Sequence, residues 1–315
     1  MTRSAAASLV LLAALLWGLV GVAVRGVLDA GVGALEVAFW RCLLAGGLFC
    51  LHASAKRDLR LAAPTDLGVL AAFALLANAA HYVAFNAAVL HGGVGLVNLF
   101  LATLPALIAL GAALSGDPPE GITLGLVGVS VLGLALAAGG GGAGVSVSAL
   151  SVGVSLAAAL TLTAYTLWGK GLLLRYSPAG LNAFVMPLSA LALLPFVSFG
   201  AKSPEVWGLL VVLAVFPTYL AHLFYQTGLK HLSSTRAALL ASLEVPVALL
   251  TAAFLGERFS GWGVLGVVLV LSVPPLAVLG DRGGGGCASA ARPVRANTRP
   301  PRRPARPARR AARSS

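Results

Sequence analysis

The chain has 315 residues, of which 58% are hydrophobic and only 10% are charged, and its mean hydropathy is +0.92. Soluble globular proteins carry about 25% charged residues, so this composition excludes a soluble protein and places the chain in a membrane. Apolar runs of helical length fill the sequence from Ala6 to about Leu279, which leaves no room for a separate catalytic domain.

The formal net charge of +12 lies mainly in the tail at residues 281–315, where ten arginines stand against one aspartate and leave only +3 for the rest. From Arg292 to Arg313 the arginines alternate with prolines, which predicts a disordered segment that lies on anionic lipid. The tail lacks the aromatic residues typical of single-strand binding, so we expect no nucleic-acid partner. The three cysteines, Cys42, Cys50 and Cys287, are too few for a disulfide framework.

A membrane helix needs about 20 residues, and by that measure the sequence predicts ten spans in two sets of five. The runs are too long for strands and do not alternate every two residues, which predicts an all-α integral membrane protein. The first five expected spans are Ala6–Val24, Ala34–Ala53, Asp66–Leu90, Val94–Leu114 and Gly121–Ala138. The second five are Ala149–Leu174, Pro178–Phe199, Pro204–Leu229, Ser233–Leu255 and Ser260–Leu279.

The lysines and arginines of short loops indicate the orientation, because they stay on the cytoplasmic side. With the N-terminus inside, the cytoplasmic segments receive Arg3, Lys56, Arg57, Arg60, Lys170, Arg175, Lys230, Arg236 and the tail. The outer side receives only Arg25, Lys202 and Arg258. An even number of spans also puts the tail inside, so we expect a multi-pass protein of the cytoplasmic membrane with both termini in the cytoplasm.

The two halves resemble each other when the chain is shifted by 141 positions. The shift matches His81 with His222 and Pro105 with Pro246. Five spans are an odd number, so the second half enters from the opposite side and the repeats are inverted. This arrangement is typical of secondary transporters that open a central site to either side. The predicted organisation is a first repeat at 1–138, a glycine-rich joint at 139–148, a second repeat at 149–280 and the tail at 281–315.

Several short motifs occur in matching order in a known family. They are Trp17-Gly18, Arg41, the stretch from Ala87 through Pro105 to Gly125, Gly228–Leu232, Ala237, Glu244–Pro246 and the Leu255–Arg258 turn. With them the chain resembles the EamA-type transporters of the drug/metabolite transporter superfamily. The first repeat departs from the family pattern, with Gly116–Pro119 where a Gly-Glu-Arg turn is expected. The resemblance implies ten helices in two repeats and transport, usually export, of amino acids, related polar compounds or drugs.

Glu244 is the acidic residue in the middle of an expected span, two residues before Pro246. A charged carboxylate at the bilayer centre costs at least about 2.5 kcal/mol, and burial disfavours its ionised form. Pro246 loosens the helix beside it. The functional interpretation is a group that meets a substrate amine or couples transport to a proton. The structural alternative is a protonated glutamate that hydrogen-bonds a neighbouring helix.

The matched histidines His81 and His222 each have polar neighbours at helical spacing. The first face carries Asn78, Tyr82 and Asn86, and the second carries Tyr219 and Gln226. These faces predict either the lining of a polar cavity or hydrogen bonds between helices. An intramembrane enzyme or regulatory protein that uses His81, His222 and Glu244 as acid and base groups is the alternative function.

Arg41 is expected about two turns inside the second span. It either binds a substrate carboxylate through its planar guanidinium or extends outward to the lipid headgroups. Four aromatic residues are candidates for cavity walls that stack on cargo or for packing and interface anchors: Trp17, Trp40, Tyr165 and Trp168.

Small residues repeat at close spacing around Gly125 and Gly266, which predicts close helix packing in a scaffold or a homodimer. The chain has no Walker A pattern, which argues against ATP as the energy source. No ligands sit at metal spacing, so neither a metal nor another cofactor is expected. The expected partners are a small-molecule substrate and the lipid bilayer.

Overall fold

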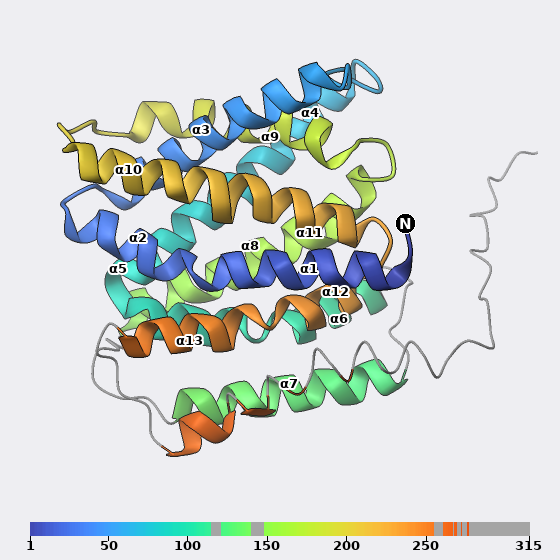
Figure 1. Cartoon of the computed structure of the whole chain (residues 1–315), viewed down its shortest axis with the longest axis vertical. Coiled ribbons are helices and arrows are strands. Elements are labelled where there is room, and N and C mark those ends of the chain that lie inside the picture. The colour runs from blue at the N-terminus through green and yellow to red at the C-terminus, as the bar shows by residue number, and fades with distance from the viewer. Residues whose placement is uncertain are drawn as a thin grey trace, which may run out of the picture.

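A computed structural model describes residues 1–114, 121–139, 148–254, 261–266, 268, 269, 272 and 276. Within these residues the protein consists of helices, joined by short turns and connections (Figure 1). This confirms the all-α prediction. Most of the glycine-rich joint, most of the expected tenth span, the turn at 255–258 and the arginine-rich tail with Cys287 lie outside the described residues.

Seven helical stretches of the described chain are long and apolar enough to cross a membrane. They are Arg3–Asp29, Ala34–Ala55, Asp66–Asn98, Ala149–Leu172, Pro178–Phe196, Pro204–Leu229 and Ser234–Thr251. Large aliphatic side chains such as Leu51, Leu76 and Leu191 stay exposed along them, as lipid-facing surfaces require. The protein is therefore a multi-pass integral membrane protein.

The helices of the first half follow the expected spans with several interruptions. The first span divides into α1 (Arg3–Gly18) and α2 (Val20–Asp29), and the second is α3 (Ala34–Ala55). The next stretch comprises α4 (Asp66–Phe73), a π-helical segment (Ala74–Ala79) and α5 (Ala80–Leu101), which bends at Gly93, where φ is 86°. The half ends with α6 (Leu104–Leu114) and α7 (Gly121–Gly139).

The second half repeats this order. It begins with α8 (Ala149–Leu172) and α9 (Pro178–Leu193), which ends in a short 3-10 turn (Leu194–Phe196). The eighth span is α10 (Pro204–Leu213), a π-helical segment (Ala214–Leu220) and α11 (Ala221–Leu229). The ninth is α12 (Ser234–Ala241) and α13 (Glu244–Phe254).

The interruptions fall at matched places in the two halves. The π-helical segments begin at residues 74 and 214, an offset of 140, and each precedes one of the matched histidines. Helix breaks at 102–103 and 242–243 precede Pro105 and Pro246. A proline has no N–H for the carbonyl four residues earlier, so it interrupts the helical ladder there. At both breaks a hydroxyl donates to the carbonyl three residues earlier: Thr103 to Phe100 at 2.7 Å and Ser242 to Leu239 at 2.6 Å.

The two halves pack against each other through several helix pairs. The most extensive contacts join α5 to α8, α3 to α9 and α1 to α11, and each pair takes one helix from each half. In Figure 1 α1 lies beside α12 and α13, while α7 lies along the lower edge of the bundle. Gly18 packs so closely on α13 that a Cβ there would lie 2.5 Å from Val247. Residues of both halves therefore form the interior of the bundle.

Candidate functional site

A narrow cavity with a volume of about 30 Å³ lies between the two halves. Helices of both halves contribute to its wall, which consists of Trp17, Val20, Arg41, His81, Tyr82, Phe85, Leu101, Leu162, His222 and Glu244. A second, smaller cavity of about 10 Å³ adjoins it, because Trp17, Leu162 and Glu244 line both. The structure thus brings together six of the candidates named from the sequence: Trp17, Arg41, His81, Tyr82, His222 and Glu244.

Glu244 is the first residue of α13, directly after the helix break at 242–243. Its position is therefore a helix start inside the bundle rather than the middle of a continuous helix. The residue is only 9% exposed and lies where the two cavities meet. Among the hydrogen bonds and ion pairs of the described residues, none involves its carboxyl group. A buried carboxyl without a protein partner is free to take a proton or bind a ligand.

Arg41 projects from α3 into the interior and is 3% exposed, so it does not extend to the headgroups. Its Nε donates to Thr218 Oγ1 at 3.2 Å, and its guanidinium carbon lies 4.4 Å from the centre of the Tyr82 ring. No ion pair within 4.0 Å joins it to Glu244 in the described part of the chain. The cavity therefore carries a cationic and an acidic group on separate parts of its wall.

Each cavity histidine is oriented by a backbone carbonyl. His222 Nδ1 lies 2.7 Å from the Thr218 carbonyl oxygen, and His81 Nδ1 lies 3.1 Å from that of Ala158. A carbonyl only accepts, so Nδ1 donates in both rings and Nε2 is the acceptor atom when the ring is neutral. Tyr82 Oη, 3.2 Å from His222 Nε2, then donates to it. Nε2 of His222 is therefore paired with Tyr82, and Nε2 of His81 is the ring atom that can accept a hydrogen bond or a proton from the cavity side.

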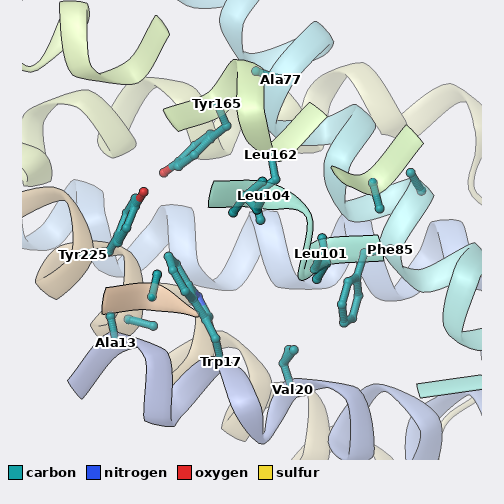
Figure 2. Close-up of a cluster of buried hydrophobic side chains, with 14 of the residues drawn as sticks. Ala13, Trp17, Val20, Ala77, Phe85, Leu101, Leu104, Leu162, Tyr165 and Tyr225 are labelled. Atoms are coloured by element: carbon teal, nitrogen blue, oxygen red, sulfur yellow. The ribbon is translucent and has the colours of Figure 1, made fainter. Parts of the chain in front are cut away.

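Trp17 positions the second-half residues of the cavity. Its indole Nε1 donates to the Pro217 carbonyl at 3.0 Å, and its ring contacts His222 and Tyr225 at centroid distances of 5.4 and 4.9 Å. Figure 2 shows Trp17 and Tyr225 close together, with Leu101, Leu104 and Leu162 nearby. Tyr225 and Thr166, whose hydroxyl oxygens lie 3.2 Å apart, line the second cavity. Sequence reasoning missed both, although Tyr225 follows His222 by three residues on one helix face.

The other sequence candidates lie outside the lining of these two cavities. Most of them join helices: Asn78 donates to Ser189 at 2.9 Å, Asn86 to the Ala34 carbonyl at 3.1 Å, and Tyr219 pairs with His52 at 2.8 Å. Gln226 bonds both Asn182 and Tyr165. Trp168 packs edge-on against Phe73. Trp40 lies near the start of α3, against Phe39 and Trp207.

Comparisons with known proteins agree with this architecture. The EamA-like transporter family matches this chain twice, at residues 4–139 and 149–273. One solved crystal structure, described only as that of a protein, has 18% sequence identity and a TM-score of 0.72 over 90% of this chain and 99% of the other. That likeness concerns the fold alone. No curated protein matches the sequence.

The family match covers most of the chain, with one copy of the domain in each half. It also decides between the two function classes that the sequence left open, because the members of this family are transporters and not enzymes. The chain accordingly belongs to the EamA-like transporter family of the drug/metabolite transporter superfamily, and it is a membrane protein of secondary transport.

Proposed function

We propose that this protein exports a small polar metabolite across the cytoplasmic membrane by alternating access, with Glu244 as the proton-coupling residue. The observation that carries the proposal is the buried Glu244 carboxyl, which lies where two internal cavities meet and has no hydrogen-bond or ion-pair partner among the residues that the structure describes. Ionisable groups inside a membrane domain usually mark a substrate or ion pathway.

The proposed topology has ten spans in two inverted repeats, with both termini in the cytoplasm. The matched π-helical segments and the matched breaks before Pro105 and Pro246 support a duplicated unit. The excess of lysine and arginine in the loops assigned to the inside supports the orientation. In such an arrangement a central site can open to either side by rocking one set of helices against the other.

Coupling requires a group that interacts differently with the protein in the two access states. The position that matches Glu244 in the first half is Thr103, whose hydroxyl bonds the Phe100 carbonyl. One half therefore carries a titratable group where the other carries a neutral one. Only differential binding lets a proton bias the equilibrium between two states, and this asymmetry supplies a physical basis for it. His81 and His222 are placed to relay the proton or to contact the cargo.

The lining also favours a class of cargo. Arg41 offers a guanidinium suited to a carboxylate, and Glu244 offers a counterpart for an amine. Trp17, Tyr82 and Phe85 supply aromatic surface around them. A small molecule that carries an amine and a carboxylate, such as an amino acid or a related compound, fits this combination. The Arg41 and Glu244 side chains would contact opposite ends of it.

The experiment begins with a metabolite panel that is screened for thermal stabilisation of the purified protein. A ligand at 100 times its Kd stabilises the folded state by about 2.7 kcal/mol, which makes a true cargo easy to detect. Flux of that cargo is then measured in proteoliposomes across a range of pH. Glu244→Gln keeps the size and hydrogen-bonding groups but cannot ionise, so it should lose the pH dependence of transport while folding normally.

Glu205→Gln is the matched control, because Glu205 is an exposed carboxylate on the first turn of α10. It should transport as the parent protein does at every pH. If Glu244→Gln keeps both the rate and the pH profile, Glu244 is a structural residue, and the protein is a facilitator that moves its substrate down a gradient.

A further inference from the structure

A buried cluster of charged and aromatic side chains lies at the end of the molecule where α3 begins. Lys202, in the connection between α9 and α10, forms an ion pair with Glu36 in the first turn of α3. The two side chains are only 3% and 5% exposed. Lys202 Nζ also lies 5.6 Å from the ring centres of both Trp40 and Trp207, and Trp40 Nε1 donates to Glu36 at 3.2 Å. We call these four residues the α3–α10 clamp.

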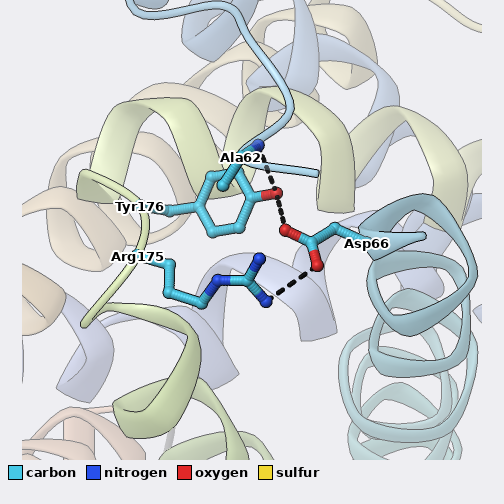
Figure 3. A network of polar contacts seen from close by, with 4 residues as sticks. All are labelled: Ala62, Asp66, Arg175 and Tyr176. Atoms are coloured by element: carbon cyan, nitrogen blue, oxygen red, sulfur yellow. Dashed lines mark hydrogen bonds and ion pairs between the residues drawn. The ribbon is translucent and has the colours of Figure 1, made fainter. Parts of the chain in front are cut away.

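A second cluster, drawn in Figure 3, lies at the start of α4, which follows the end of α3 rather than its beginning. Asp66, the first residue of α4, pairs with Arg175 Nη1 at 2.8 Å and accepts a hydrogen bond from Tyr176 Oη at 2.7 Å. The Ala62 backbone N–H donates to the same tyrosine oxygen at 3.1 Å. Burial and the bond to Asp66 raise the pKa of Tyr176, which keeps its hydroxyl a donor. We call Asp66, Arg175 and Tyr176 the α4–α8 clamp.

The two clamps occupy equivalent places in the repeat. In the second half α9 corresponds to α3, and α10 to α4, since the π-helical segments follow α4 and α10. The α4–α8 clamp joins the start of α4 to the connection that precedes α9. The α3–α10 clamp joins the connection that precedes α10 to the start of α3. Exchanging the halves therefore brings the two clusters to neighbouring positions, with the acidic and basic partners interchanged.

Each clamp also links two helices that build the cavity wall, one from each half. The α3–α10 clamp links α3, which carries Arg41, to the span that carries His222. The α4–α8 clamp links the span that carries His81 and Tyr82 to α8, which carries Leu162. For a cargo to reach the cavity from one end, helices of the two halves have to separate at that end. Both clamps are closed in this structure.

We propose that these clusters are the two gates of the transport cycle, with Glu36–Lys202 at the outer end and Asp66–Arg175–Tyr176 at the inner end. Breaking the buried Glu36–Lys202 pair leaves an uncompensated charge unless water reaches it, so the outer gate opens as its charges become hydrated. At the inner end the Arg175 side chain is already 49% exposed and the Asp66 side chain only 6%, so Asp66 is the group that gains water when the inner gate opens. This inference rests on the proposed function, because it takes alternating access as the purpose of the cavity. It adds residues that touch neither the cavity nor the cargo.

The test measures how fast a cysteine in the cavity reacts from each side of the membrane. Leu162→Cys is placed in a full-length background with Cys42, Cys50 and Cys287 replaced by alanine, and oriented vesicles are treated with a membrane-impermeant thiol reagent. Lys202→Met removes the outer charge and should raise labelling from the outer side by roughly tenfold or more, since one truncated partner unbalances the pair. Arg175→Met should raise labelling from the inner side by a smaller factor, because the Arg175 side chain is 49% exposed and water already screens its ion pair.

Two further variants keep the test decisive if a truncation fails to reach the membrane. Glu36→Lys with Lys202→Glu reverses the pair and should return outer labelling to the parent rate. Tyr176→Phe removes only one hydroxyl and should raise inner labelling by a smaller factor than Arg175→Met. If these variants leave labelling unchanged on both sides of the membrane, the clusters are not gates. The same conclusion follows if variants of both clusters change labelling from only one and the same side. Labelling needs no cargo, so this result is independent of the Glu244→Gln transport assay.

Discussion

Replacement of Gly18 by alanine should force α1 away from α13 beside Glu244. A Cβ at Gly18 would lie 2.5 Å from Cβ and Cγ1 of Val247 and 3.0 Å from the Glu244 carbonyl oxygen. Carbon atoms in contact prefer a separation of about 3.5–4.0 Å, so the helices would have to move apart by about 1 Å. The Val247 Cβ is fixed to its backbone, so rotation of the side chain cannot relieve the contact.

The size of the effect follows from two opposing terms. Overpacking of this kind costs about 1–3 kcal/mol, whereas the better helix propensity of alanine returns at most about 1 kcal/mol. We therefore expect Gly18→Ala to lower the free energy of unfolding by about 1–2 kcal/mol, the balance of these terms. Unfolding by SDS in mixed micelles, followed by circular dichroism, measures this quantity.

Two companion variants isolate the contact. Gly47→Ala is the control, because Gly47 lies on the exposed side of α3 and a Cβ there would meet no atom within 4 Å. It should be neutral or slightly stabilising. Val247→Ala should lower the free energy of unfolding by about 1 kcal/mol less in the Gly18→Ala background than in the parent protein, and this difference is the coupling energy of the two residues. Equal stability of Gly18→Ala and Gly47→Ala, or full additivity with Val247→Ala, would refute the close approach of α1 and α13.

Three other predictions concern Arg41, the tail and the topology. Arg41→Lys should lower the free energy of unfolding by about 1–2 kcal/mol, because lysine cannot both bond Thr218 and cover the Tyr82 ring as the planar guanidinium does. The control Arg25→Lys, at an exposed ion pair, should leave the free energy of unfolding unchanged. Equal values for the two variants would show that Arg41 is held by its charge alone. Deletion of residues 292–315 should leave transport largely intact, and normal membrane levels without transport would contradict this. A tag after Ser315 should be inaccessible from outside intact cells, and labelling there would overturn both the ten-span topology and the inverted repeats.

The positions of the helical spans could be predicted from the sequence alone. The apolar runs from Ala34 and Ala149 become α3 and α8, since a backbone in lipid has to satisfy its hydrogen bonds within the helix. Matched prolines predicted a loosened helix, and breaks lie just before Pro105 and Pro246. These features depend on neighbours within a few residues, which the sequence displays directly.

The orientation of polar side chains was only partly accessible. Asn78 and His81 belong to one turn of the third span, yet the first bonds Ser189 between helices and the second lines the cavity. Helical spacing identifies the residues of a face but not the neighbour that this face meets. In a membrane protein both lipid and protein surroundings are apolar, so hydrophobicity does not distinguish them.

The sequence by itself determined the membrane class, the helical spans, the duplication and the family, because each depends on composition, local periodicity or motif order. Only the tertiary structure decided that Arg41 is buried against Tyr82, that Glu244 begins a helix between two cavities, and that Lys202 pairs with Glu36. The partners in these contacts come from separate elements of the fold: Arg41 and Tyr82 are 41 residues apart, and Glu36 and Lys202 are 166 residues apart. Their encounter is set by how the two halves pack, and that packing is a property of the whole bundle rather than of any segment.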